Sequence, residues 1–380
     1  MESFETKHTS EDLKIMQSWP LDRKIRVSQL RIMEWYERNH GNVYVSLSGK
    51  DSHVALDLAR RIYPDVPALF IDTGLEYPEL RQFIRSERNV TIVRPSMRFD
   101  EVISRYGYPI ISKEVAEAIY YARRIASKNG VGGKTSERKR KELLGLRTDS
   151  AKGESMFNKS KWLPVARDLP IPVTHYCCTV MKKRPAHHYA HQTGQLPIIG
   201  TMADESRVRK QAWIRKGCNA FDGRNPSSQP LSFWTEQDVL AYISLTSLPI
   251  PAPYGEIITV DKHGNPCDGR CEGCKYKCTG ASRTGCIFCA FGAHSESKKE
   301  PGRFQRLAIT HPKQYEYSIG GGQWVDNPAY DPTASMEPDA MGWVNWNPKK
   351  IWVPSKEGLG MGKVFDLLNE IYGTDFIRYK

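Results

Sequence analysis

Residues Val43–Asp57, which read VYVSLSGKDSHVALD, decide the fold of this 380-residue chain. The run up to Ser48 is rich in β-branched and aromatic residues and predicts a strand, whereas the apolar residues after the turn recur at helical spacing. Backbone amides at the start of a helix carry partial positive charge and suit a phosphate, sulfate or pyrophosphate group. We therefore predict an anion-holding corner between the strand and the helix, formed by Ser46, Ser48, Gly49, Lys50 and Ser52.

The turn itself is not one of the common phosphate loops. It matches neither the GxxxxGKS/T pattern nor the GxGxxG pattern, because it has a single glycine. Asp51 has two interpretations, as a cap of the helix or as a ligand of Mg²⁺. A capped strand–helix turn that binds no ligand is the alternative interpretation of the whole corner.

The flanking segments repeat the alternation of strand and helix. Residues 66–74 (VPALFIDTG) and 89–95 (NVTIVRP) predict two further strands, with a helix that begins at Pro78 between them. Further elements are expected at 20–40, 114–127, 182–191 and 233–243 (helices) and at 196–203 (a strand). This order predicts an α/β fold, a parallel sheet with helices on both faces. Such sheets bind ligands beyond the carboxyl ends of their strands, so a second turn is expected to line the pocket with Asp72, Thr73, Gly74 and Glu76.

Composition excludes several classes of protein. The N-terminus, MESFETKHTSEDLK, is polar and predicts no signal peptide, and no apolar run approaches the ~20 residues of a membrane span. We therefore expect a cytoplasmic protein that does not enter a membrane. Nine cysteines in a chain without an export signal favour metal or redox chemistry over a disulfide framework.

The positive charge of the chain is concentrated in one segment. Residues 122–147 contain nine lysines and arginines against two glutamates, in a chain whose formal net charge is +12. One interpretation is a contact with the phosphate backbone of tRNA or DNA, because clustered basic residues are the electrostatic footprint of nucleic-acid binders. The other is a solvated basic surface.

The cysteines fall into groups with different spacing. A first set consists of an adjacent pair and a later Cys-x-x-Cys, namely Cys177, Cys178, Cys286 and Cys289. A second set lies within twelve residues that also contain two glycines, namely Cys267, Cys271, Cys274 and Cys278. The second spacing suits zinc, with a second iron–sulfur cluster or a set of sulfur-relay thiols as the alternatives. Cys218 stands alone and is expected to be a small buried residue.

The turn resembles the SGGxDS pyrophosphate loop (PP-loop) of adenine nucleotide alpha-hydrolase-like proteins, in particular that of phosphoadenosine phosphosulfate (PAPS) reductase relatives. Four later segments are similar to that family and follow in its order: IDTGLEYPE (71–79), YCCTVMKKRP (176–185), GTMADESRVRKQAW (200–213) and PLSFWTEQDVLAYI (230–243). The likeness covers roughly residues 40–295 and is that of a phage- or prophage-type member.

The resemblance implies a division of the chain. A PP-loop nucleotide-binding domain is expected at 41–248, with a basic insertion at about 122–150. It is preceded by an N-terminal helical segment at 1–40 and followed by a cysteine-rich metal or cluster region at 249–295. An aromatic-rich, irregular C-terminal extension is expected at 296–380.

The resemblance also implies roles for individual residues. It implies that Lys50, Asp51 and Arg207 act on the reacting group, and that Glu205 and Arg207 join the two turns in binding the nucleotide. Arg209 is a further candidate for clamping the anion. The Cys-Cys pair and Cys-x-x-Cys of the family's adenylyl-sulfate reductase branch hold a 4Fe-4S cluster, which implies the same for Cys177, Cys178, Cys286 and Cys289. A disulfide is the alternative for those four cysteines.

The chain departs from the family pattern at two places. The loop has one glycine fewer than SGGKDS, and no cysteine follows Cys289, whereas the family uses a mobile C-terminal cysteine to attack the sulfate sulfur. Unless a cysteine of the 267–278 group replaces it, the reductase mechanism lacks its nucleophile.

Three functions are consistent with these features. The first is a PAPS reductase-family enzyme, an oxidoreductase or sulfurtransferase, that binds PAPS, adenylyl sulfate or ATP and performs iron–sulfur-assisted sulfur chemistry. The second is an ATP-dependent enzyme that thiolates tRNA or DNA held by residues 122–147. The third is a non-catalytic regulator that keeps the fold. A small-molecule nucleotide is the expected partner in the first case, and a homodimer is a further expectation.

Overall fold

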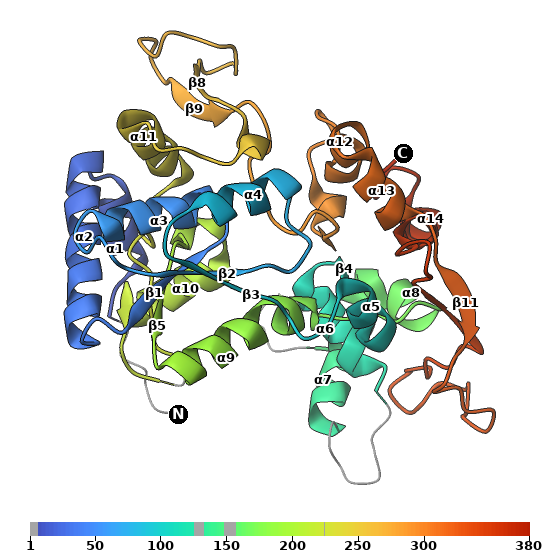
Figure 1. The fold of residues 1–380 in the computed structure, drawn as a ribbon. Coiled ribbons are helices and arrows are strands. Elements are labelled where there is room, and N and C mark those ends of the chain that lie inside the picture. Colours follow the sequence, from blue (N-terminus) through green and yellow to red (C-terminus); the bar gives the residue numbers. More distant parts are fainter. Residues whose placement is uncertain (1–6, 125–132, 148–156, 224) are drawn as a thin grey trace. The chain divides into compact units, whose positions relative to one another are not determined.

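The structure is a computed structural model that describes all residues except 1–6, 125–132, 148–156 and 224 (Figure 1). The chain divides into two compact units, each formed from two separate stretches of sequence. Unit 1 comprises Met1–Pro95 and Lys182–Cys286, and unit 2 comprises Ser96–Met181 and Ile287–Lys380. Among the described residues, no helix combines the length and the apolar character needed to span a membrane.

Unit 1 is built on a six-stranded sheet in the order β3-β2-β1-β5-β7-β6. Neighbouring strands are parallel, except for β6 and β7, which are antiparallel. The strands are β1 (Val43–Leu47), β2 (Ala68–Ile71), β3 (Val90–Val93), β5 (Leu196–Ile199), β6 (Asn219–Ala220) and β7 (Ser227–Ser228). The α/β fold predicted from the strand–turn–helix pattern is therefore confirmed.

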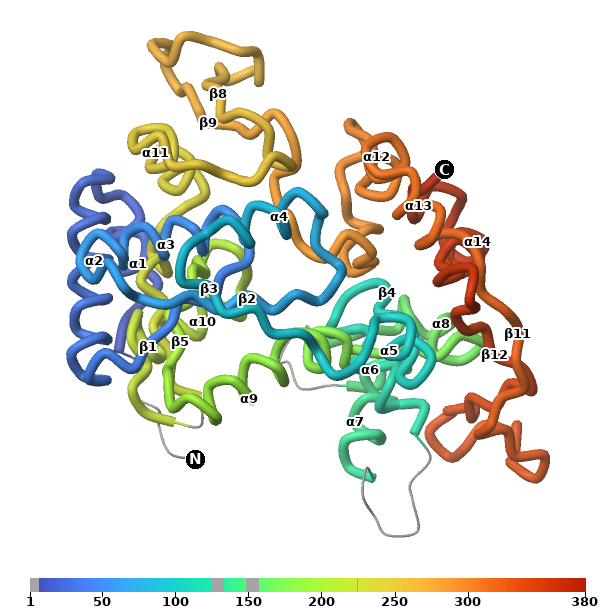
Figure 2. Tube along the Cα trace, in the orientation of Figure 1, coloured from blue at the N-terminus to red at the C-terminus, as the bar shows by residue number. Residues whose placement is uncertain are grey.

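Helices pack against both faces of this sheet. Helix α3 packs on β1, and α9 packs on β2 and β3 from the opposite side (Figure 1). The helices of unit 1 are α1 (Ser10–Gln17), α2 (Leu21–Arg38), α3 (Lys50–Arg60), α4 (Pro78–Ser86), α9 (Arg184–Thr193), α10 (Arg207–Lys216) and α11 (Glu236–Thr246). After α11 the chain forms a hairpin of β8 (Ile257–Val260) and β9 (Lys275–Cys278), as Figure 2 traces.

Apolar residues of β1 and α3 form the centre of the core of unit 1. Val43, Val45 and Leu47 on the strand and Val54 and Leu58 on the helix are all buried. Burying such a side chain stabilises a fold by about 1.5–3 kcal/mol, so this interface fixes where α3 begins relative to the end of β1. The start of α3 is therefore held rigidly at the edge of the sheet.

Unit 2 contains short strands and several helices. Strand β4 (Ile110–Ile111) pairs in parallel with β10 (Ala290–Phe291), and β11 (Gln323–Asp326) pairs in antiparallel with β12 (Lys350–Val353). Its helices are α5 (Phe99–Tyr106), α6 (Lys113–Ala122), α7 (Gly133–Leu144), α8 (Leu163–Arg167), α12 (Arg303–Thr310), α13 (Pro312–Ile319) and α14 (Met361–Tyr372). The region beyond residue 296 thus forms three helices and a hairpin, joined by irregular connections.

Much of the basic segment 122–147 is engaged inside unit 2. The Arg123 guanidinium donates to the carbonyls of Val165, Ala166, Leu169 and Ile171. Lys139 is buried 3.4 Å from the Glu142 carboxylate, and Arg140 donates to the Ala122 carbonyl. Residues 125–132 of this segment lie outside the described residues. These contacts give several of the basic side chains a structural role that the charge pattern alone does not predict.

Replacing Arg123 is expected to destabilise unit 2. Arg123→Ala leaves four carbonyls without their guanidinium donor, and hydrogen bonds to a charged group contribute about 1.5–3 kcal/mol each. We expect the free energy of unfolding, measured by urea denaturation, to fall by about 3 kcal/mol or more. Arg138→Ala, on the exposed face of α7, is the matched control and should change it by less than about 0.5 kcal/mol. Equal effects of the two variants would contradict the structural role of Arg123.

Candidate functional site

The predicted corner lies at the carboxyl end of β1, where α3 begins at Lys50. The Ser52 hydroxyl closes this turn from within the helix. It accepts the amides of Ser48 and Gly49 at 2.8 and 3.0 Å, and donates to the Gly49 carbonyl at 2.8 Å. Ser52, predicted to contact the ligand, is thus also a structural part of the loop.

Lys50 brings a buried positive charge to this corner. The residue is 2% exposed, and its Nζ donates to the Ser282 carbonyl at 2.9 Å. The carboxylates of Glu236 and Asp51 lie 3.4 and 3.6 Å from the same Nζ. Burial alone would lower the pKa of Lys50, but the neighbouring acidic groups, Asp51 first among them, raise it. Lys50 is therefore an ammonium at neutral pH.

Asp51 is also buried, in the first turn of α3. Burial raises the pKa of its carboxyl group, and the Lys50 ammonium offsets this only in part. Its position beside Lys50 makes it a charge partner of that lysine.

Tyr254 covers the anion corner. Its hydroxyl accepts the Lys50 amide at 3.0 Å and lies 2.7 Å from the Thr284 hydroxyl. A Cβ atom on Gly49 would lie 2.6 Å from this Tyr254 oxygen, closer than side chains pack. The single glycine of the loop is thus required by the close approach of Tyr254. In this arrangement a phenol oxygen takes the hydrogen bond that an anion would accept at the start of the helix.

The segment after β5 also approaches the corner. A Cβ atom on Gly200 would lie 2.7 Å from the Asp51 carbonyl oxygen, so glycine allows β5 to end against the first turn of α3. Glu205 forms ion pairs with Arg209 and with Arg283, the latter at 3.6 Å. Burial, Arg283 next and opposed by Asp51, lowers the pKa of the Arg209 guanidinium. The structure therefore brings Arg209 and Glu205 toward the corner, whereas Arg207 is exposed at the start of α10.

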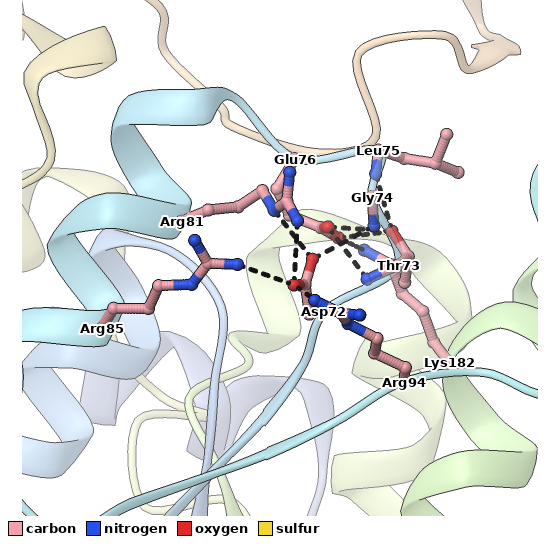
Figure 3. A network of polar contacts seen from close by, with 9 residues as sticks. All are labelled: Asp72, Thr73, Gly74, Leu75, Glu76, Arg81, Arg85, Arg94 and Lys182. Atoms are coloured by element: carbon pink, nitrogen blue, oxygen red, sulfur yellow. Dashed lines mark hydrogen bonds and ion pairs between the residues drawn. The ribbon is translucent and has the colours of Figure 1, made fainter.

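The second predicted turn, Asp72–Glu76, follows β2 at the same edge of the sheet. Thr73 and Glu76 bond to each other, with the Thr73 hydroxyl 2.8 Å from a Glu76 carboxylate oxygen. Lys182 lies 3.6 Å from Glu76. Asp72 is buried beneath three arginines, Arg81, Arg85 and Arg94, as Figure 3 shows. The turn is therefore a charged network, and its arginines were not among the predicted site residues.

The second cysteine group forms a compact cluster of three. The ligand atoms of Cys267, Cys271 and Cys274 all lie within 4.8 Å of one another. The structure joins Cys271 and Cys274 in a disulfide, so this pair holds a metal only when it is reduced. The cluster lies in the hairpin connection between β8 and β9, within the described part of unit 1.

Cys278 does not join that cluster in the described residues. It lies at the end of β9 and is buried. Burial raises the pKa of its thiol, and the Lys50 ammonium offsets this in part. Its thiol is thus within electrostatic reach of the anion corner. Cys218 is buried as predicted and accepts the Ser232 hydroxyl at 3.3 Å.

The cysteines assigned to the iron–sulfur cluster belong to both units. Cys177, Cys178 and Cys289 are in unit 2, and Cys286 is the last residue of unit 1. Cys177 is buried and the other three are partly exposed. Cys177 and Cys178 precede a π-helical turn at Thr179–Lys183, a local irregularity that is frequent at functional sites.

Sequence reasoning missed several residues that the structure places at the site. Tyr254, Ser282 and Thr284 come from the segment after α11, more than 200 positions from the turn they contact, and no local pattern identifies them. Arg81 and Arg85 have a signal that was available. Both stand on the helix directly after the Asp-Thr-Gly turn, four residues apart and hence on one face.

Comparisons with known proteins give one consistent family. A family model described as the phosphoadenosine phosphosulfate reductase domain matches residues 42–110 and 111–289. The adenosine 5'-phosphosulfate reductase of Geobacillus kaustophilus is 21% identical over 222 residues, 53% of this chain and 91% of that protein. That of Bacillus velezensis is 23% identical over 137 residues, 34% of this chain and 57% of that protein. The chain thus spans little more than half the length of the second relative.

One solved structure is also similar. A phosphoadenylyl-sulfate (PAPS) reductase from Candida auris, in a phosphate complex, is 16% identical to this chain. The alignment covers 68% of this chain and 97% of that one, with a TM-score of 0.33.

The contact between Gly49 and Tyr254 is expected to appear as coupling between two substitutions. Gly49→Ala should lower the free energy of unfolding by about 1–3 kcal/mol, because the added Cβ overpacks against the Tyr254 hydroxyl. Tyr254→Phe removes that oxygen, so the double variant should recover most of the loss in urea denaturation. Gly285→Ala, at a glycine with open space around it, is the control. Strictly additive effects of the two substitutions would contradict the close approach.

Proposed function

This chain belongs to the phosphoadenosine phosphosulfate reductase family, and from that premise we propose that it is an oxidoreductase that binds an adenine sulfonucleotide at the β1–α3 corner and reduces it. The single observation that carries the proposal is Lys50, a buried ammonium at the start of a helix and at the carboxyl edge of a parallel sheet. Open sheets of this kind bind ligands at that edge. A buried cation beside helix amides favours an anionic group.

Binding requires the contacts that now cover the corner to change. An anionic oxygen that reaches the Lys50 amide displaces the Tyr254 hydroxyl, which accepts that amide in this structure. The hydroxyls of Tyr254 and Thr284 remain available to donate to the same anion. Arg209 and Arg283, gathered by Glu205, add positive charge on the side of β5.

Cys278 supplies the thiol that reduction requires. Its thiolate attacks the sulfate sulfur, a sulfur–sulfur bond forms, the bond from that sulfur to the phosphate oxygen breaks, and AMP leaves with the electron pair. A second thiol, from an external dithiol reductant, then attacks the S-sulfocysteine and releases sulfite. Lys50 promotes the first step because its charge favours the Cys278 thiolate and balances the departing phosphate.

The cysteines Cys177, Cys178, Cys286 and Cys289 would hold a 4Fe-4S cluster. Four thiols are the donor set that such a cluster requires, and the partial burial of these cysteines fits a site shielded from solvent. When bound, the cluster supplies positive charge and redox capacity near the substrate.

The three clustered sulfurs of Cys267, Cys271 and Cys274 would hold zinc once Cys271 and Cys274 are reduced. That metal would be structural, because the cluster lies on the hairpin whose flanking residues include Tyr254 and Ser282. Metal binding would order the segment that covers the corner.

Thiolation of a nucleic acid is a weaker proposal. Its main support was the basic segment, but Arg123, Lys139 and Arg140 are engaged in contacts within unit 2. A non-catalytic regulator has one supporting observation, the Tyr254 hydroxyl on the Lys50 amide. The regulator becomes the better proposal if neither the native protein nor Tyr254→Phe binds any adenine nucleotide.

The proposal predicts that the protein, reconstituted anaerobically with iron and sulfide and supplied with a dithiol, releases sulfite from adenylyl sulfate or PAPS. Lys50→Met should weaken nucleotide binding at least tenfold, because it removes the buried ammonium. Cys278→Ser should retain binding in calorimetry and lose sulfite release. Cys218→Ser is the matched control, since Cys218 bonds to Ser232 within the core. A fully loaded protein that binds nucleotide but releases no sulfite would refute the reductase reaction.

Metal analysis tests the two cysteine sets separately. Anaerobically purified protein should contain iron and acid-labile sulfide that are lost in Cys178→Ser. It should also contain zinc that is lost in Cys267→Ser but not in Cys178→Ser. Loss of both metals in either variant would show that the two sets are not independent.

A further inference from the structure

We infer that Arg85 and Arg94 form a second anion subsite, which takes a phosphate group of the nucleotide other than the one held at the β1–α3 corner. The inference rests on the proposed function, because it assumes that an adenine nucleotide binds at this sheet edge. It specifies the substrate as an adenine nucleotide that carries two separate phosphate-containing groups.

The arginines converge on one carboxylate. Asp72 follows β2, Arg81 and Arg85 stand on α4, and Arg94 follows β3. The Arg81 Nε lies 2.8 Å from one Asp72 carboxylate oxygen, while Arg85 Nη2 and Arg94 Nε lie 3.3 and 3.7 Å from the other. Figure 3 shows the three guanidinium groups arranged around this single acid.

The three arginines differ in exposure. The side chains of Arg81, Arg85 and Arg94 are 29, 50 and 73% exposed, whereas that of Asp72 is 1% exposed. Burial would raise the pKa of Asp72, but Arg81 and then Arg85 lower it, so the carboxyl is ionised. Arg81 holds this carboxylate with a short contact to each of its two oxygens. The carboxylate is thus already paired when Arg85 and Arg94 are considered.

Positive charge is in excess within the network. Of the residues in Figure 3, Arg81, Arg85, Arg94 and Lys182 are cationic, and Asp72 and Glu76 are the two carboxylates. Like charges held this close repel each other unless an anion separates them. Arg85 and Arg94, the two exposed arginines, therefore offer donors to an anion from solution.

Strand register places this cluster beside the corner. Leu47 of β1 pairs with Phe70 of β2, so two residues further along each strand Gly49 and Asp72 reach the same edge. Ile71 pairs with Val93 of β3, which puts Arg94 next to Asp72. Neighbouring strands are ~4.8 Å apart, so one nucleotide extends from the corner to the arginines across two strands.

The chemistry of the subsite favours phosphate. Guanidinium groups present a planar fork of donors that matches the oxygens of a phosphate, and such charge-assisted hydrogen bonds are stronger than neutral ones. The subsite therefore distinguishes nucleotides that carry a second phosphate on the ribose from those that do not.

The test compares AMP with adenosine 3',5'-bisphosphate by titration calorimetry on the full chain. The native protein should bind the bisphosphate at least tenfold more tightly than AMP. The double variant Arg85→Ala/Arg94→Ala should remove this preference and change AMP affinity less than threefold, because Arg81 still neutralises Asp72. The variant Arg85→Lys/Arg94→Lys keeps the charge and loses the fork, so it should keep part of the preference.

Two controls separate the subsite from a structural role. Arg215→Ala removes an exposed arginine from α10 of the same unit and should leave the preference intact. Thermal unfolding identifies a variant that is merely destabilised, and the Lys variant then serves in place of the Ala variant. Native protein that binds both nucleotides equally would overturn the subsite and leave the proposed function standing. Native protein that binds neither nucleotide would overturn both.

Discussion

The carboxyl edge of the parallel sheet in unit 1 imposes the constraint on which the rest of the site depends. Parallel strands all end on this edge, so the turns after β1, β2 and β5 bring their polar residues to one place. Two of those residues, Lys50 and Asp72, are charged and each 2% exposed. An isolated buried charge costs several kcal/mol, so each must be surrounded by groups of opposite charge.

The two charges are compensated in different ways. Lys50 lies among the Ser282 carbonyl, Glu236 and Asp51, contributed by elements far apart in the sequence. Asp72 is compensated by arginines from the next helix and the next strand, and in excess. The first arrangement is closed over by Tyr254, whereas the second leaves positive charge exposed. A nucleotide with anionic groups at two points satisfies both.

Sequence reasoning predicted the parts of this edge that local chemistry determines. The strand, the turn and the start of α3 follow from hydrophobic spacing, and Thr235 caps α11 as predicted, with its hydroxyl accepting the Asp238 amide. Tyr254 was beyond reach because its contact with the loop depends on how a segment some 200 residues later folds back. The basic segment misled for a related reason. A formal charge count does not distinguish Arg123, whose guanidinium binds four carbonyls, from an arginine in solvent.

The structure also changes the meaning of the cysteine-rich segment. Its spacing predicted a set of four, but three sulfurs cluster while Cys278 lies apart, buried and under the influence of Lys50. The same segment carries Tyr254, Ser282 and Thr284 onto the corner. The addition to the chain that bears the metal candidate is therefore also the part that covers the anion corner, and the two features belong to one piece of structure.

The central claim is that the β1–α3 corner binds the phosphate of an adenine nucleotide. A crystal structure of the protein with AMP at saturating concentration tests it most directly. The account predicts the 5'-phosphate at the start of α3, bonded to the Lys50 amide and ammonium, with the Tyr254 hydroxyl moved off that amide. AMP bound elsewhere, with Tyr254 still on the Lys50 amide, would contradict it.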